Sequence, residues 1–349
     1  MSLLIKNTKI GSKSPPFIIA EMSGNHNQSL DRALKIVEAA ANCGVHAIKL
    51  QTYTADTITL DVKDEEFFIN DKKSLWNGKC LYELYDEAHT PWEWHEPIMN
   101  YATDQGLICF SSPFDDTSVE FLESLNVPAY KIASPEIIHL PLIKKVASTG
   151  KPIIISTGMA SISEINDAIT VAKMEGCKDI VLLKCTSSYP STPKNSNISS
   201  IEHMKKLFNC NVGLSDHTLG IGAAVAAVAY GASVIEKHFT LDRSEGGVDS
   251  AFSLEPQEMK QLVIETKRAW ESIGEISYGP LESEKNSLMF RRSIYVSKEI
   301  QKGETFNDSN IRIIRPGLGI HPKYFDLLIG RKAKQNLKKG TALNWDMIV

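Results

Sequence analysis

Short apolar segments alternate with helical segments eight times within the first 273 residues, and this alternation restricts the fold more than any other feature. The apolar segments have the length of buried strands, and each precedes a stretch that suits a helix. They cover residues 15–21, 45–51, 107–111, 129–134, 152–157, 179–186, 213–218 and 234–240. Near-continuous apolar strands that alternate with helices are typical of a parallel sheet. Eight such units in about 260 residues predict an α/β fold, a (β/α)8 TIM barrel.

An open doubly wound sheet is the alternative, but no GxGxxG motif lies in the first βα turn to support it. The expected helices cover residues 29–44, 92–104, 117–125, 142–148, 163–174, 201–208, 219–232 and 255–273. Residues 52–91 interrupt the alternation. A long insertion on a compact scaffold is usually functional, so we expect this one to serve the site.

The pattern changes after Gly279 to short apolar segments separated by glycine turns. We therefore predict a catalytic barrel at 1–275, a linker at 276–290 and a small, mostly β domain at 291–349. The expected short strands lie at 291–297, 302–306, 311–317 and 338–343. Such a domain is small for a core of its own, so we expect it to pack on another surface.

Composition excludes several classes of protein. The net charge of −4 gives no reason to expect nucleic acid or an anionic membrane as a partner. The N-terminus lacks the apolar region of a secretory signal, and the longest apolar run, 223–230, is too short to cross a bilayer. The six cysteines show no zinc-like spacing and suit a reducing cytoplasm.

In a TIM barrel the catalytic groups lie at the carboxyl ends of the strands. Polar residues at the predicted strand ends are Glu21, Lys49, Gln51, Ser111, Ser112, Lys131, Ser134, Glu136, Ser156, Lys184, Ser215, His217, Glu236 and His238. Ammonium and hydroxyl groups bind phosphate, so the three lysines and the serines predict a site for a phosphorylated, doubly anionic ligand. The alternative is that some of these lysines form ion pairs with the surrounding helices.

Two histidines end neighbouring predicted strands, each beside an acidic residue: His217 in Ser-Asp-His-Thr and His238 in Glu-Lys-His-Phe. Parallel neighbours bring such strand ends together, so both imidazoles can reach one divalent transition metal. For a single histidine a structural role would be the simpler interpretation. The paired placement favours the metal site.

Carboxylates at the strand ends suit acid–base chemistry or the binding of sugar hydroxyls. Glu21, Glu136 and Glu236 are the candidates, although any of them can instead hold a lysine or a metal-binding histidine. Asp249 lies on the last βα loop and suits a ligand hydroxyl. The aromatic residues Trp92 and Trp94 suit either the floor of a sugar pocket or the core of the insertion.

Five motifs together resemble the sialic acid synthase family. They are Ile19-Ala-Glu-Met-Ser-Gly-Asn-His-Asn27, Ala129-Tyr-Lys-Ile-Ala-Ser-Pro-Glu136, Ile155-Ser-Thr-Gly-Met159, Gly213-Leu-Ser-Asp-His-Thr218 and Glu236-Lys-His-Phe-Thr240. The C-terminal domain is similar to the family's antifreeze-like (SAF) domain, and Ile314-Arg-Pro-Gly-Leu-Gly319 matches its arginine loop. Within the family, the first motif and His89-Thr-Pro-Trp-Glu-Trp-His95 look most like those of the pseudaminic acid synthases.

The resemblance implies a metal-dependent condensation of phosphoenolpyruvate with a 2,4-diacetamido-2,4,6-trideoxy sugar, giving a nine-carbon 2-keto acid and phosphate. It implies His217 and His238 as ligands of Mn²⁺ or Mg²⁺. It also implies a phosphoenolpyruvate site formed by Lys49, Ser112, Lys131, Ser134, Ser156, Lys184 and Ser215, and a sugar site formed by Glu21, Gln51, Tyr189 and Asp249. Arg315 would complete the sugar site from the other subunit of a domain-swapped homodimer.

For the chemical step we assign candidate roles to Glu21, Lys131, Glu136 and Glu236. Two alternatives remain open from the sequence. One is a synthase for neuraminic or legionaminic acid, which would use almost the same groups. The other is a protein that binds sugar without catalysis, although such binding requires neither paired histidines nor three lysines at strand ends.

Overall fold

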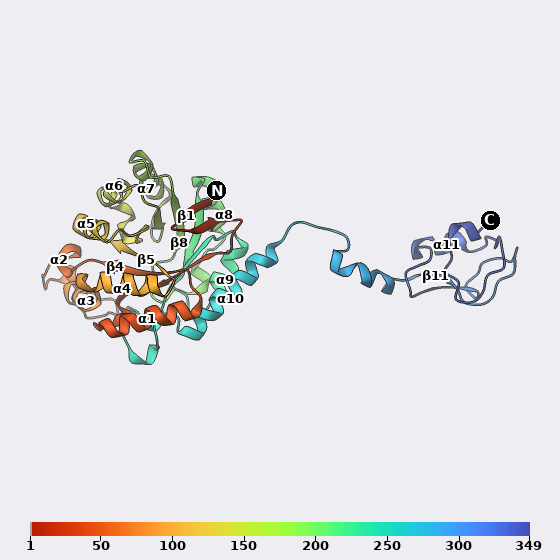
Figure 1. Cartoon of the computed structure of the whole chain (residues 1–349), viewed down its shortest axis with the longest axis horizontal. Helices are drawn as coiled ribbons and strands as arrows, with labels where there is room; N and C mark the ends of the chain where they lie inside the picture. Colours follow the sequence, from red (N-terminus) through yellow and green to blue (C-terminus); the bar gives the residue numbers. More distant parts are fainter. Residues whose placement is uncertain (1) are drawn as a thin grey trace. The chain divides into compact units, whose positions relative to one another are not determined.

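The computed structural model describes residues 2–349 and divides the chain into two compact units, 1–274 and 275–349. In the first unit, helices surround a central set of strands (Figure 1). Eight parallel strands close into a barrel in the order β10-β3-β4-β5-β6-β7-β8-β9. They are β3 (Phe17–Glu21), β4 (Ala47–Thr52), β5 (Ile108–Pro113), β6 (Tyr130–Ile132), β7 (Ile153–Ser156), β8 (Ile180–Cys185), β9 (Asn211–Ser215) and β10 (Val234–His238). The predicted TIM barrel is confirmed.

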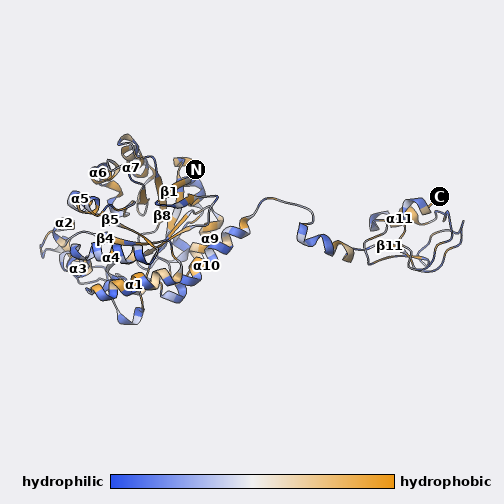
Figure 2. Cartoon of the chain, in the orientation of Figure 1, coloured by the Kyte–Doolittle hydropathy of each residue, from blue (hydrophilic) through white to orange (hydrophobic). Residues whose placement is uncertain are grey.

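A helix follows each barrel strand and covers the outside of the barrel. These helices are α1 (Leu30–Cys43), α4 (Trp92–Asp104), α5 (Asp116–Ser124), α6 (Leu140–Ala147), α7 (Ile162–Met174), α8 (Ser200–Phe208), α9 (Gly222–Ala229) and α10 (Pro256–Ile273). Local chemistry sets their ends: the Ser29 hydroxyl accepts a hydrogen bond from the Arg32 amide, and Gly44 ends α1 at a φ of 80°. Most of these helices carry hydrophobic and hydrophilic residues side by side (Figure 2), as expected when one face packs on a sheet.

Two hydrophobic layers result from the alternation of side chains along the strands. Residues that point outward pack against the helices, and those that point inward form a second cluster inside the barrel. On β10, for example, Val234 belongs to the inner cluster and Ile235 to the outer one. This alternation decides which residues at the strand ends can face a ligand.

An N-terminal hairpin not anticipated from the sequence adds to the inner cluster. Strands β1 (Ser2–Ile5) and β2 (Thr8–Gly11) pair antiparallel. Leu3, Ile5 and Ile10 are buried together with Phe17 of β3. The hairpin therefore contributes side chains to the hydrophobic interior that lies below the catalytic end.

The insertion between β4 and α4 contains more regular structure than the sequence indicated. Two short helices, α2 (Ala55–Ile58) and α3 (Leu81–Ala88), lie within it, and an isolated bridge joins Phe68 to Cys80. Single turns of 3-10 helix occur throughout the chain: η1 (Ser23–His26), η2 (Glu65–Phe67), η3 (Pro135–Ile138), η4 (Pro193–Asn195), η5 (Arg243–Glu245), η6 (Ser250–Phe252), η8 (Pro322–Tyr324) and η9 (Trp345–Met347).

The second unit has its own core, formed by residues such as Ile294, Phe306, Leu328 and Leu343. Its sheet consists of β11 (Ser293–Val296) and β12 (Ile311–Ile314), paired antiparallel. The strands expected at 302–306 and 338–343 form only isolated bridges, so that part of the prediction is wrong. A longer 3-10 helix, η7 (Glu282–Phe290), precedes β11, and α11 (Phe325–Leu328) follows β12. Within residues 2–349, no helix has both the length and the hydropathy required to cross a membrane.

Candidate active site

A cavity opens at the carboxyl ends of the barrel strands, where the sequence predicted the site. Its volume is about 60 Å³. Its lining consists of Glu21, Lys49, Gln51, Lys131, Ala133, Ser134, Pro135, Ser156, Cys185, Tyr189, Ser215, His217, Glu236 and His238. The structure thus brings together most of the polar side chains that the sequence placed at strand ends.

Lys184 is an exception, because the alternation along β8 directs it away from this cavity. Val181 and Leu183 point into the barrel, and Cys185 lines the cavity, so Lys184 lies on the opposite face of the strand. Its ammonium donates to the Cys185 carbonyl at 2.7 Å and approaches the Thr186 hydroxyl at 3.4 Å. The expectation that Lys184 lines the site is not met in this structure.

Glu21, Lys49 and Gln51 form one polar side of the cavity. The Lys49 ammonium pairs with the Glu21 carboxylate, and it lies 3.2 Å from the Ser112 hydroxyl. The Gln51 amide donates to the other Glu21 oxygen at 3.0 Å. Burial raises the pKa of Glu21 to about 7, although Lys49 acts against this shift. Glu21 can therefore exchange a proton near neutral pH.

Glu236 links the two lysines inside the barrel. One of its oxygens accepts from the Ser215 hydroxyl at 2.9 Å and lies 3.9 Å from the Lys131 ammonium, and the other lies 3.8 Å from Lys49. Burial raises the pKa of Glu236, but the two ammonium groups outweigh burial and leave the pKa lowered. Burial lowers the pKa of Lys131, and Glu236 offsets this only in part. Glu236 thus stays ionised and holds both lysines in the cavity.

Two hydroxyl groups near Lys131 are free to donate to an anion. The Ser134 hydroxyl accepts the Gly158 amide at 3.0 Å, which leaves its own proton available. The Ser156 hydroxyl is buried and has no hydrogen-bond partner among the described residues. A side chain at Gly158 would overlap the Ser134 and Ser187 hydroxyls, so these serines would have to move to admit one. Buried donors without partners are costly unless a ligand accepts from them, so this side of the cavity is suited to an anion.

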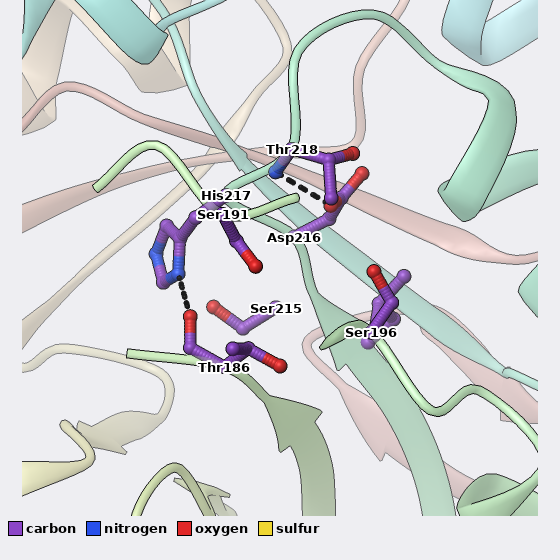
Figure 3. Close-up of a pocket in the computed structure, with 8 residues that line it drawn as sticks. Thr186, Ser191, Ser196, Ser215, Asp216, His217 and Thr218 are labelled. Atoms are coloured by element: carbon purple, nitrogen blue, oxygen red, sulfur yellow. Dashed lines mark hydrogen bonds between the residues drawn. The ribbon is translucent and has the colours of Figure 1, made fainter. Parts of the chain in front are cut away.

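His217 and His238 face each other at the ends of β9 and β10, with their ring centroids 5.3 Å apart. The Nδ1 atom of His217 donates to the Thr186 carbonyl at 3.0 Å, as Figure 3 shows. The buried Nδ1 of His238 faces the Asp249 carboxylate at 3.9 Å. In both rings Nδ1 therefore faces a protein oxygen, and Nε2 remains available to a ligand.

The two imidazoles fit a metal site that has only two protein ligands. Within residues 2–349, no group of three or more His, Cys, Asp or Glu side chains is arranged to hold a metal. Burial and the neighbouring His217 depress the pKa of His238 far below its usual value, so that ring is neutral, as ligation requires. Burial lowers the pKa of His217, but Cys185 and the Thr186 carbonyl outweigh burial and raise it. Substrate or water would complete the shell.

Aromatic rings form a wall beside the histidines. The Tyr189 ring lies 4.5 Å from that of His217, and Phe252 packs 4.8 Å from His238. Trp76 of the insertion contacts Tyr189 at 5.7 Å, and its indole donates to the Val248 carbonyl at 2.9 Å. The insertion thus contributes Trp76 to this wall. Trp92, in contrast, stacks on Phe121, as expected for a core residue.

Asp249 and Glu136 flank the cavity without lining it. Asp249 accepts a hydrogen bond from the Ser23 hydroxyl, and burial raises its pKa. Glu136 is the second residue of η3, and one of its oxygens is buried without a partner among the residues described. Burial raises the pKa of Glu136 to about 7, the range in which a carboxylate can act as general base or acid.

Cys185 lines the cavity with a titratable side chain that the sequence analysis missed. Its thiol lies 3.9 Å from Nδ1 of His217. Burial raises the pKa of this thiol, but the contact with His217 outweighs burial and lowers the pKa to about 7. The uniformly apolar run at 180–183 does not show which residues face inward, so the sequence carried no signal for this side chain. Arg315 lies in the second unit directly after β12, where its side chain is exposed.

Comparison with known proteins gives concordant results. The NeuB family matches residues 36–278, and the SAF domain matches residues 291–349. The pseudaminic acid synthase of Campylobacter jejuni is 45% identical over 327 residues, which cover 94% of this chain and 95% of that protein. The pseudaminic acid synthase of Helicobacter pylori is 44% identical over 336 residues, with coverages of 96% and 98%.

Relatives of lower identity also match most of this chain. The N,N'-diacetyllegionaminic acid synthase of Campylobacter jejuni is 36% identical over 326 residues, which cover 92% of this chain and 97% of that protein. The crystal structure of an N-acetylneuraminic acid synthetase from Leptospira borgpetersenii, in complex with citrate, has a TM-score of 0.72 at 34% identity. The match covers 82% of this chain and 95% of that one.

Proposed function

This chain belongs to the NeuB family, and we propose that it is a phosphoenolpyruvate-condensing pseudaminic acid synthase. Its substrates would be phosphoenolpyruvate, water and 2,4-diacetamido-2,4,6-trideoxy-L-altrose, and its products pseudaminic acid and phosphate. One structural observation carries the proposal. A single cavity joins a pair of imidazoles to lysine and serine donors suited to a phosphorylated anion.

We assign phosphoenolpyruvate to the side of the cavity that holds Lys131, Ser134 and Ser156. The ammonium of Lys131 and the two hydroxyls supply donors to the phosphate and carboxylate oxygens. Glu236 connects this side to Ser215, which donates to it, and to Lys49, which lies 3.8 Å away. The Lys49 ammonium also contacts the Ser112 hydroxyl. Charge that builds up on the leaving phosphate would be stabilised by Lys131 and Lys49, because both are fixed before the reaction begins.

We assign the sugar to the side formed by Glu21, Gln51, Tyr189 and Asp249. The Glu21 carboxylate and the Gln51 amide offer hydrogen bonds to hydroxyl or acetamido groups. The aromatic wall of Trp76, Tyr189 and Phe252 is suited to the apolar parts of a 6-deoxy sugar. Pseudaminic acid synthases are more similar to this chain than the legionaminic acid synthase, which supports this choice of sugar.

His217 and His238 would hold a divalent metal through their Nε2 atoms, with Mn²⁺ or Mg²⁺ as the candidate ions. When bound, the metal would supply Lewis-acid polarisation of the sugar aldehyde. The Thr186 carbonyl orients the ring of His217 through a hydrogen bond, and the Asp249 carboxylate faces Nδ1 of His238 at 3.9 Å.

In the proposed reaction, C3 of phosphoenolpyruvate forms a bond to the aldehyde carbon, and positive charge develops at C2. Water adds to C2, and its released proton goes to the new alkoxide oxygen. The bond between C2 and the bridging oxygen then breaks, so that phosphate leaves with that oxygen and with the proton of the C2 hydroxyl. Glu136 is the candidate for accepting the proton from water, and Glu21 for relaying it toward the sugar.

The test is phosphate release from phosphoenolpyruvate in the presence of a panel of sugars, with and without a chelator. We expect a higher kcat/KM for the diacetamido altrose sugar than for N-acetylmannosamine or the legionaminic acid precursor, and loss of turnover after chelation. Preferred turnover of another sugar would reassign the substrate. Binding of sugar without phosphate release from any of them would instead favour a non-catalytic sugar-binding protein.

Oxygen-18 in the bridging position of phosphoenolpyruvate tests the bond that breaks. The label should appear in the released phosphate. Label retained in the keto acid would rule out the proposed C–O cleavage.

A further inference from the structure

Three successive side-chain pairs join the ends of β9 and β10, and only two of them face the cavity. Ser215 donates to Glu236 inside the barrel, and the rings of His217 and His238 face each other there. Asp216 and Lys237 lie between these two pairs, on the outer face of the same strands. Their placement follows from the alternation, because Leu214 and Ile235 belong to the outer cluster.

The outer pair is buried and closely bonded. The side chains of Lys237 and Asp216 are 0% and 1% exposed, and their charged atoms lie 2.7 Å apart. Lys237 also donates to the Thr218 carbonyl, and the Thr218 amide donates to Asp216 at 2.9 Å. Figure 3 shows the carboxylate of Asp216 turned toward Thr218 and the ring of His217 turned toward Thr186. The chain is thus held on both sides of His217.

The position of this pair along the strands is what suggests a function. The β9–β10 ladder ends at the pair Ser215 and Glu236, one residue before the ion pair and two before the histidines. Beyond that point, one backbone hydrogen bond crosses between the strands, from the Asp216 amide to the Glu236 carbonyl at 3.0 Å. The ion pair therefore continues the connection between the strands where the ladder has stopped.

We propose that Asp216 and Lys237 are positioning residues that fix the separation and orientation of His217 and His238 for metal binding. This inference rests on the metal site of the proposed function. A buried ion pair is weak support for stability alone, because a neutral pair of similar volume can fold as well. Its directional bonds to Thr218 and across the strands define a geometry that a neutral pair would not define.

The test measures Mn²⁺ affinity of the full-length protein by electron paramagnetic resonance of free Mn²⁺, together with thermal unfolding of the metal-free protein. The variants are Asp216→Asn, Lys237→Met and the double variant Asp216→Asn/Lys237→Met. His217→Ala reports loss of the site itself. Lys151→Met is the matched control, because it removes an ion pair with Glu123 at a distant part of the barrel surface.

We expect Asp216→Asn and Lys237→Met to weaken Mn²⁺ binding about 10- to 100-fold, the range found for residues that orient metal ligands. The double variant should regain much of the unfolding temperature, because no unpaired charge stays buried, and it should still bind Mn²⁺ weakly. Lys151→Met should bind as the unaltered protein does. Asp216→Asn preserves shape, so it remains decisive if Lys237→Met does not fold.

Wild-type Mn²⁺ affinity in folded Asp216→Asn, or recovery of both affinity and stability in the double variant, would overturn the positioning role alone. Equal Mn²⁺ affinity in the unaltered protein and His217→Ala would overturn the metal site, and the positioning role with it. The two failures are therefore distinguishable.

Discussion

The imidazole rings of His217 and His238 lie 5.3 Å apart at an angle of 56°, although a complete βα unit separates them in the chain. The closed barrel makes this approach possible by pairing β9 with β10 in parallel. Thr186 and Asp249 then face the two Nδ1 atoms, so both Nε2 atoms remain for one ion. The proposed metal site thus depends on the register of the two strands and on the oxygens of Thr186 and Asp249.

Replacement of either imidazole should abolish the condensation without unfolding the barrel. We expect His217→Ala and His238→Ala to lose phosphate release and Mn²⁺ binding while keeping the circular dichroism spectrum of the unaltered protein. His203→Ala, on the exposed face of α8, is the control and should leave both unchanged. Full turnover in His217→Ala would show that the site has been assigned to the wrong residues.

The sequence predicted that Lys131 and Lys184 both bind phosphoenolpyruvate, but we expect their replacement to change kcat/KM by different amounts. Lys131 lines the cavity, and Lys184 lies on the other face of its strand. Lys131→Met should lower kcat/KM for phosphoenolpyruvate about 100-fold or more, as expected for loss of a fixed donor to developing charge. Lys184→Met should change it less than tenfold. Steady-state kinetics with phosphoenolpyruvate as the varied substrate measure both, and a larger loss in Lys184→Met would restore that lysine to the anion site.

The raised pKa of Glu136 leads to a pH prediction. With a pKa of about 7, this carboxyl loses its proton as the pH rises through neutrality. If it accepts a proton from water, kcat/KM should increase through that range and reach a plateau above it. Glu136→Gln should remove this limb and lower kcat about 10²- to 10⁴-fold, the usual contribution of a general base. Glu120→Gln, on the surface of α5, should keep the profile. An unchanged profile in Glu136→Gln would assign the limb to another group, with Glu21 the next candidate.

The eight barrel strands and most of the cavity lining could be predicted because each barrel strand ends in polar residues after an apolar run. The direction of Lys184 could not. Both faces of a barrel strand are buried, so the apolar run at 180–183 gives no visible alternation from which to infer the inward face. The N-terminal hairpin was missed for a different reason. Lys6 in its turn has a φ of 48°. Lysine rarely adopts this left-handed conformation, so its presence in the sequence does not indicate such a turn.

The second unit was predicted less well because its strands are short. Ile300 and Leu337 are buried, but they are joined to each other by a single bridge. Segments of this length and composition suit a short strand or an irregular loop equally, and tertiary contacts decide between them. The role of Arg315 stays a prediction from the family resemblance, because it would require a second chain.

Mixing two inactive variants tests whether the second unit completes the active site of a partner chain. We propose a domain-swapped homodimer in which Arg315 of one subunit reaches the barrel of the other. His217→Ala should be inactive because its barrel is damaged. Arg315→Ala should be reduced about 100-fold if its guanidinium contacts the bound substrates.

In a swapped heterodimer of these two variants, the intact barrel receives the intact Arg315 from its partner. We therefore expect phosphate release to recover after the two proteins are unfolded together and refolded, relative to each variant refolded alone. His217→Ala mixed with His238→Ala is the control, because no combination of those chains contains an intact barrel. If Arg315 served the barrel of its own chain, both mixtures would stay inactive. That result would exclude the swap and leave each chain with a self-contained site.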